Sequence, residues 1–185
     1  MYLAPDELLE IGFRSVGKNI QISRKCSFYK ISGYIGDNVR IDDFCILKGK
    51  VNIGSHVHVA AYCMISGAFA PIEIDSFVAI AARASIYSGS DDYASEMLGG
   101  AFLPDKYVTV ITGPVTIGAG TLVGAHCVIL PNVRVGLGAS IGSGCVIAND
   151  VPDGGMMRGP RAVLLDRRRD VGKIKAMIDE MEWAA

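Results

Sequence analysis

Three histidines and a pair of aspartates are the side chains of this chain best suited to acid–base chemistry. The histidines are His56, His58 and His126, and the adjacent acids are Asp91 and Asp92. Histidine is the natural base at neutral pH because its unperturbed pKa is about 6.5. An aspartate, with a pKa of about 3.9 in short peptides, is a poor base unless it is desolvated or paired. These residues predict proton removal by a histidine with a carboxylate beside it.

Aliphatic residues recur every six positions along most of the chain. The series is Ile35, Ile41, Leu47, Ile53, Val59, Ile65, Ile74, Ile80, Ile86, Ile117, Val123, Ile129, Val135, Ile141 and Ile147. An amphipathic helix repeats about every 3.6 residues, and the turns of a meander are less regular. A period of six suits a three-sided solenoid in which three short strands close one coil. Residues 16–152 are therefore predicted to form an all-β, parallel β-helix.

The cysteines follow the same repeat. Each stands four residues after an aliphatic position, where valine and alanine also occur; they are Cys26, Cys45, Cys63, Cys127 and Cys145. A small apolar side chain at that place points into the prism. We expect core cysteines, and disulfides or a thiol nucleophile are the less favoured interpretation.

Two interruptions of the period mark extra chain. The step from Ile65 to Ile74 is nine residues, which adds three near Ala68 to Pro71. The step from Ile86 to Ile117 is thirty-one, which leaves an inserted loop over about 88–114. Long loops on a rigid scaffold usually carry function. The loop, which contains SGSDDYASEMLGGAFLPDKY, is predicted to lie at the site.

The remaining segments flank one predicted domain that spans 1–185. Residues 1–15 contain a candidate helix over about 4–12, and the tail 153–185 contains an amphipathic pattern over about 165–183. The net charge of -1 gives no general attraction for nucleic acid or an anionic membrane. No long apolar run or signal-peptide pattern is present, so we expect a cytoplasmic protein without membrane insertion.

The chain resembles the left-handed β-helix acyltransferases, which are hexapeptide-repeat proteins. The resemblance covers about residues 11–165 and rests on the repeats, the long loop and the stretch VGAHCVILPNVRVGLGASIGSGCVIAND. It implies a left-handed coil, acetyl-CoA as co-substrate and a homotrimer. ELLEIGFRSVGKNI, IGDNVRIDDFCIL, HVAAYC and IYSGSDDY further resemble the subgroup that acetylates sugars of surface polysaccharides such as lipopolysaccharide O-antigen. That subgroup includes acetyltransferases acting on nucleotide-linked 4-amino-4,6-dideoxyglucose, so an amino or hydroxyl group of an activated sugar is the implied acceptor.

His58 is the preferred candidate for the base. Galactoside-type relatives place a histidine at the start of the long loop, where this chain has SGSDDY instead. His58 immediately precedes the repeat residue Val59, so its side chain should point outward near a corner where neighbouring prisms meet. A loop aspartate of one subunit could reach it there. The alternative is an interface histidine that only hydrogen-bonds backbone; His126 is the second candidate, and His56 is expected to be a solvated coil residue.

The coenzyme residues are assigned by the resemblance. It places the thiol end near Gly124 and Ala125, with the Ala125 amide as a donor to the thioester, and the pantetheine arm along Gly142 and Ser143. Charged residues that follow would pair with the phosphates; they are Arg161 and Arg167, in the run RGPRAVLLDRRR. A solvated helix start is the alternative for the arginine run.

The loop residues Ser90, Asp91, Asp92 and Tyr93 are candidates for binding the acceptor sugar. One of the aspartates would also orient the imidazole. Short SDD runs often bond their own backbone and fix a turn, and Tyr93 can serve only to anchor the loop, so both interpretations stay open. The predicted reaction is direct transfer through a tetrahedral intermediate, with no acyl-enzyme.

Two other classes of protein use the same prism. Gamma-class carbonic anhydrases need three imidazoles that converge on zinc, whereas here His56 and His58 are two apart and His126 is isolated beyond the loop. No metal site is predicted. A catalytically silent scaffold or assembly subunit is the other alternative, because the fold alone does not confer activity.

Overall fold

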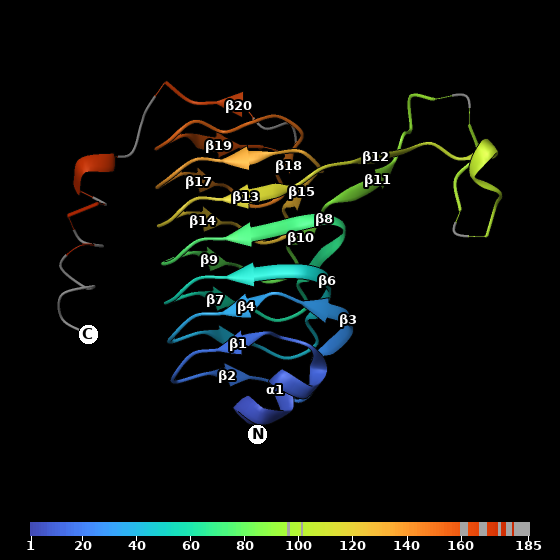
Figure 1. Cartoon of the computed structure of the whole chain (residues 1–185). Helices are drawn as coiled ribbons and strands as arrows, with labels where there is room; N and C mark the ends of the chain where they lie inside the picture. The colour runs from blue at the N-terminus through green and yellow to red at the C-terminus, as the bar shows by residue number, and fades with distance from the viewer. Residues whose placement is uncertain are drawn as a thin grey trace.

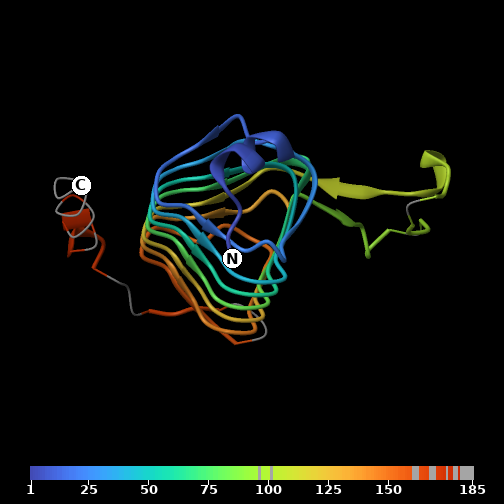
Figure 2. The same ribbon diagram turned by 90° about the horizontal axis from the view of Figure 1, so that it is seen from below.

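The computed structural model is a three-sided parallel β-solenoid from which one long arm projects (Figure 1). Seen along its axis, the stacked coils enclose a single interior (Figure 2). The structure describes residues 1–95, 97–100, 102–159, 163–166, 170–173, 175–176 and 179. No helix in this part of the chain is both long and apolar enough to span a membrane.

Each face of the prism is a ladder of short strands from successive coils. The first face contains β1 (Ser15–Val16), β4 (Tyr34–Ile35), the ends of β6 (Ile46–Ile53) and β8 (Met64–Ile74), β13 (Val115–Ile117) and β16 (Arg134–Val135). The second contains β2 (Gln21–Ile22), β5 (Arg40–Ile41), β7 (His58–Val59), β9 (Ala79–Ile80), β14 (Leu122–Val123), β17 (Ser140–Ile141) and β19 (Met156–Arg158). The third contains β3 (Ser27–Ser32), the starts of β6 and β8, β10 (Ser85–Tyr87), β15 (Val128–Ile129) and β18 (Val146–Ile147).

The repeat positions fill the shared interior. All fifteen aliphatic residues of the series are at most 2% exposed and belong to one core cluster, which confirms the predicted solenoid. Register explains the arrangement: Ile41 pairs with Val59, Val59 with Ile80, and so on along the second face, so like side chains stack on one another. Burial of these columns supplies the main stabilisation of the coil.

The cysteines line the same interior. Cys45, Cys63, Cys127 and Cys145 are buried, Cys26 is half-buried, and all five are free thiols. The Cys127 Sγ donates to the Gly142 carbonyl oxygen of the next coil at 3.1 Å, and burial raises the pKa of this thiol. These are core residues, as predicted, and the Cys127 thiol, kept protonated in the interior, does not act as a nucleophile.

All irregularities of the repeat fall at the corner between the third and first faces, called the wide corner below. The regular step of six becomes seven from Phe28 to Ile35, nine from Ile65 to Ile74 and thirty-one from Ile86 to Ile117. The seven-residue step explains why the first coil is out of phase with the rest. The other two corners keep close to the hexapeptide step in every described coil.

The largest insertion forms the arm. It begins as a two-stranded antiparallel ribbon, β11 (Gly89–Asp91) with β12 (Val110–Thr112), and carries a 3-10 helix, η1 (Asp105–Tyr107) (Figure 2). At its base, the buried Ser88 Oγ accepts hydrogen bonds from the Phe69 and Ala70 amides, both at 3.1 Å. The predicted loop therefore begins as a hydrogen-bonded ribbon that is tied at its base to the bulge in β8.

Both ends of the solenoid are covered. Helix α1 (Pro5–Ile11) buries Leu8 against the first coil and begins with the Glu7 carboxylate accepting from the Ala4 amide at 2.7 Å. At the other end, β20 (Val163–Leu164) pairs antiparallel with β19. Val171–Lys173 are helical; much of the predicted C-terminal helix lies outside the described residues.

Candidate active site

His58 contacts a carboxylate from the neighbouring coil. It lies on β7, where its Cα is in register with Arg40 of β5. The His58 Nε2 is 2.9 Å from Asp42 Oδ2, and the other carboxylate oxygen, Oδ1, accepts from Arg40 Nε at 2.7 Å. The imidazole itself is half exposed. A surface histidine held at one nitrogen by a carboxylate is arranged to take a proton at the other.

Asp42 is ionised at neutral pH. Partial burial raises the pKa of this carboxyl, but the hydrogen bonds from His58 and Arg40 outweigh burial and hold the pKa below its usual value. Sequence reasoning assigned the orienting role to a loop aspartate and missed Asp42. The signal was present: Arg40 stands one coil of 18 residues before His58, and Asp42 is two positions further along.

A cavity of about 390 Å³ opens beside His58 on the second face. It is lined by small or aliphatic residues, namely Ala60, Ala79, Ile80, Ala81, Ala82, Leu122, Val123, Gly124 and Ile141. A Cβ at Gly124 would lie 2.5 Å from the Ser143 nitrogen, so the coils approach too closely there for any side chain. Two of the predicted residues, His58 and Gly124, are thus brought to one cavity.

A row of unpaired amides runs along the corner that follows this face. Among the described residues, the N–H groups of Ala61, Ala82, Ala125 and Ser143 donate to no acceptor, whereas their neighbours Gly124 and His126 do. Because successive coils are about 4.8 Å apart, these donors form a track parallel to the prism axis. Such a track suits an extended ligand that carries amide carbonyls, and the pantetheine arm of coenzyme A is one. The residues fit the predicted coenzyme, although these four coils each contribute an amide and not Ala125 alone.

The candidate phosphate-binding arginines cannot be placed. Arg161 and Arg167 lie outside the described residues. Arg158, at the end of β19, is exposed on the same face as Gly142. Gly142 itself lies where a Cβ would meet the Met157 carbonyl at 3.0 Å, so this part of the corner is also kept narrow.

A second cavity, of about 490 Å³, lies at the base of the arm. Ser90, Asp91 and Tyr93 line it from the arm, and Phe69, Tyr87, Gly89, Val110, Val128 and Leu130 complete it. Tyr93 is 89% exposed, so its ring is available to a sugar. Three of the four predicted acceptor residues therefore share one hollow.

The two adjacent aspartates differ in their contacts. The Asp92 carboxylate accepts from the Ala94 amide at 3.0 Å, and the Asp92 carbonyl accepts from Ser95 Oγ at 2.8 Å. Asp92 therefore fixes a turn of the arm. Within the described part of the arm, the Asp91 carboxylate makes no such turn contact, and Asp91 lines the arm-base cavity, where a ligand can meet it.

One chain does not bring the two cavities together. The arm leaves the wide corner, between the third and first faces (Figure 1). The second face, which carries His58 on β7, lies on the opposite side of the prism. The other histidines have separate surroundings: His56 stacks on Phe77 with ring centroids 4.7 Å apart, and His126 is exposed beside Ala125. In the described part of the chain, no three His, Cys, Asp or Glu side chains are grouped as metal ligands.

Comparison with known proteins identifies the repeat and a close relative. Residues 33–67 and 109–149 match the bacterial transferase hexapeptide family (six repeats). The dTDP-4-amino-4,6-dideoxy-D-glucose acyltransferase of Escherichia coli is 38% identical over 136 residues, which are 71% of this chain and 70% of that protein.

Solved structures agree over the whole chain. AntD, an N-acyltransferase from Bacillus cereus in complex with dTDP and 3-hydroxybutyryl-CoA, has a TM-score of 0.91 and 38% identity, covering 99% of this chain and 97% of AntD. An AntD variant in complex with dTDP-4-amino-4,6-dideoxyglucose and coenzyme A has a TM-score of 0.90 and 37% identity, over 100% and 98% of the chains. A maltose O-acetyltransferase from Clostridium difficile, at 23% identity and a TM-score of 0.58 over 89% and 74%, shares the fold. The chain therefore belongs to the hexapeptide-repeat acyltransferases, whose left-handed β-helix its three-sided coil reproduces.

Proposed function

We propose that this protein transfers an acyl group from an acyl-CoA to the amino group of dTDP-4-amino-4,6-dideoxyglucose or a closely related nucleotide-linked sugar. The observation that carries the proposal is the likeness to AntD along the entire chain, since AntD was solved with both a dTDP-sugar and a coenzyme. The E. coli relative acts on the same type of sugar. Transfer to nitrogen is preferred over transfer to oxygen because AntD is an N-acyltransferase.

Each cavity receives one substrate in this proposal. The acyl-CoA supplies an activated thioester along the amide track, beside Gly124, Gly142 and Ser143. His58, held by Asp42, removes the proton of the acceptor, and the Ala125 amide donates to the charge that develops on the carbonyl oxygen. On the acceptor side, Ser90, Asp91 and Tyr93 hold the sugar, and Asp92 keeps the arm in shape.

A homotrimer would join the two cavities. The arm carries several apolar side chains that are exposed in the single chain, among them Leu98, Phe102 and Ile111. Exposed apolar side chains on a projecting ribbon favour contact with another copy. A neighbour's second face is the surface that needs such a partner, because it holds His58 but no acceptor residues.

The proposed setting is the cytoplasm, in the synthesis of a surface polysaccharide such as O-antigen. The support is the likeness of IYSGSDDY and its surrounding repeats to enzymes that modify nucleotide-linked amino sugars. The acyl group is acetyl or a longer chain, and AntD was solved with 3-hydroxybutyryl-CoA.

A turnover screen tests the function. Purified protein is mixed with acetyl-CoA or 3-hydroxybutyryl-CoA and with dTDP-4-amino-4,6-dideoxyglucose, and free thiol release and product mass are measured. The matched control acceptor carries a hydroxyl in place of the amine. We expect amide product and thiol release with the amino sugar alone. Thiol release no faster than in the absence of acceptor, for every acyl-CoA tested, contradicts the proposal and favours a silent scaffold.

A further inference from the structure

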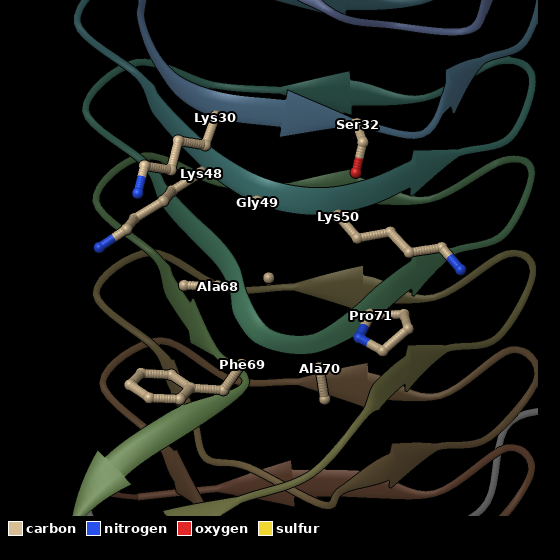
Figure 3. A pocket seen from close by; sticks show the side chains of 10 residues that line it. Lys30, Ser32, Lys48, Gly49, Lys50, Ala68, Phe69, Ala70 and Pro71 are labelled. Carbon is tan, nitrogen blue, oxygen red and sulfur yellow. The ribbon is translucent and has the colours of Figure 1, made fainter.

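A third cavity, of about 540 Å³, lies at the wide corner beside the base of the arm. Three lysines rim it, Lys30 from β3 and Lys48 and Lys50 from β6 (Figure 3). The other lining residues are mostly small: Ser32, Gly49, Gly67, Ala68, Phe69, Ala70 and Pro71. This hollow is called the lysine groove below. None of the roles assigned above uses it.

The three ammonium groups lack anionic partners. Lys30 and Lys48 extend to one side of the groove and Lys50 to the other (Figure 3). Within the described residues, none of them pairs with a carboxylate, whereas Lys25, in the turn before β3, pairs with Asp43 at 2.6 Å. Three like charges around one hollow repel each other unless an anion lies between them. The charges therefore indicate an anionic ligand long enough to reach both sides.

The backbone under the groove contains β-bulges and a residue with positive φ, Lys30. Lys30 occupies the extra position of the seven-residue step and has a φ of 49°. This left-handed conformation suits glycine or asparagine better than lysine. β-Bulges beside Lys30 and Gly49 break the ladder at the same level. Positive φ also occurs at Phe44, Tyr62 and Phe77, so Lys30 is set apart by its place in the bulge beside the groove and not by the conformation alone.

Phe69 links the groove to the acceptor cavity. Its side chain lines both hollows, and its amide is held by Ser88 at the root of the arm. A ligand in the groove can thus continue past Phe69 toward Ser90 and Asp91 without crossing the prism. The coenzyme residues Gly124 and Gly142 lie at a different corner.

We propose that the lysine groove binds the diphosphate group of the nucleotide-sugar acceptor, with Lys30, Lys48 and Lys50 paired to phosphate oxygens and the sugar directed to the arm-base cavity. This inference rests on the proposed function, which supplies the nucleotide sugar. Lysine binds phosphate as a point charge, and the pair Lys30 and Lys48 on one side with Lys50 on the other can contact both phosphates of a diphosphate. Coenzyme A also carries a diphosphate, so the test separates the two sources.

Titration of dTDP, thymidine and coenzyme A into the whole protein tests the groove. The double variant Lys48→Ala/Lys50→Ala should bind dTDP about tenfold or more weakly, since each lost charge-assisted contact weakens binding by that order. Its affinities for thymidine, which has no phosphate, and for coenzyme A should change less than about twofold. Lys18→Ala, an exposed lysine outside the groove, is the matched control, and thermal melting checks that each variant is folded.

Two outcomes overturn the inference. Unchanged dTDP affinity in the folded double variant removes the lysines from nucleotide binding. Weakened coenzyme A binding with unchanged dTDP binding assigns the groove to the coenzyme instead.

Turnover distinguishes the failure of the proposed function: if no dTDP-amino sugar is acylated and dTDP binding still depends on the lysines, the function is wrong and the groove stands. If turnover is normal and its KM for the sugar is insensitive to the lysines, the groove is wrong and the function stands.

Discussion

Asp42 and His58 belong to consecutive coils, so their contact is part of the solenoid ladder. His58 lies on β7 and Asp42 directly follows β5, and these two strands pair in register, Arg40 with His58 and Ile41 with Val59. A catalytic side chain on a regular strand is held more firmly than one on a loop. Arg40 fixes the opposite oxygen of the carboxylate, which leaves Asp42 one way to face the imidazole. We regard Asp42 as a positioning residue for His58.

The variant Asp42→Asn tests this role. We expect kcat to fall about tenfold with little change in the KM for acyl-CoA, because the imidazole loses its orienting charge but the coenzyme surface is intact. A double variant, Asp42→Asn/His58→Ala, should be no slower than His58→Ala alone. Additive losses in the double variant would show that Asp42 does not act through His58.

The pKa of Asp42 also gives a pH dependence of stability. Its folded pKa lies below the ordinary value of 3.8, so the carboxylate stabilises the fold above that pH and the contribution is lost as pH falls through the folded pKa. The melting temperatures of wild type and Asp42→Asn should therefore differ above pH 4 and converge in stronger acid. A constant difference across this range contradicts the assigned pKa shift.

Single residues were predictable to the extent that the repeat governs them. The place of His58 before Val59 predicts an outward side chain, and the period of six predicts the burial of all fifteen aliphatic residues of the series. The partner Asp42 depends on register between coils, which a scan along one coil does not reveal. The different contacts of Asp91 and Asp92 depend on the turn after β11, whose geometry the letters SDD leave open.

At the level of elements, the corners have distinct tasks. The corner after the second face is regular and narrow, and its repeated N–H groups suit a ligand that follows the prism axis. The wide corner breaks the period repeatedly and holds the bulges, the lysine groove and the arm. In the proposed function, the regular repeats hold the coenzyme and the interruptions hold the acceptor.

Replacing one glycine at the regular corner and a control glycine at another corner tests whether the coenzyme binds at the regular corner. A Cβ at Gly124 would lie 2.5 Å from the Ser143 nitrogen, and a Cβ at Gly118, at a different corner, would lie 2.7 Å from the Leu137 nitrogen. Both Gly124→Ala and Gly118→Ala should lose about 1–3 kcal/mol of stability from overpacking. Only Gly124→Ala should also weaken coenzyme A binding, by about tenfold in a titration. Equal coenzyme affinity in the two variants would place the coenzyme elsewhere.

The sequence located the arm but not its form. The thirty-one-residue step marks the insertion within a residue or two, since flanking repeats constrain both ends. The pairing of β11 with β12 is antiparallel and lies outside the repeat, so the period carries no information about it. Alternation in VTVIT was the available local signal for a strand.

At the level of the whole molecule, the proposed site is divided. The acceptor cavity and the lysine groove adjoin the arm, and His58 with the amide track lies across the prism. In the proposed trimer, the arm of one copy reaches the second face of another and so joins the two cavities. The proposed trimer therefore makes a residue of one chain complete the site of another.

Mixing two inactive variants tests this division. Homotrimers of His58→Ala and of Asp91→Ala should each retain at most about a tenth of the activity. When the two variants are co-expressed in equal amounts, the mixed trimers should regain about a quarter of wild-type activity. About a quarter of the sites between subunits then receive an intact His58 from one chain and an intact Asp91 from its neighbour. The readout is thiol release per site, with assembly measured by sedimentation.

Two controls limit the interpretation of the mixture. Variants purified separately and combined without subunit exchange should show no recovery. A mixed trimer that forms but remains at the level of the separate variants would mean that His58 and Asp91 act within one chain or not at all.

The covered ends of the prism decide how long the molecule is. A coil that stacks on an identical coil has no internal reason to stop, since each edge offers unpaired backbone to the next. Here α1 occupies one edge and the reversed strand β20 the other. The number of coils is therefore set by these two short terminal elements and not by the repeat. The same elements keep the unpaired strand edges of one molecule from pairing with those of another and growing into fibrils.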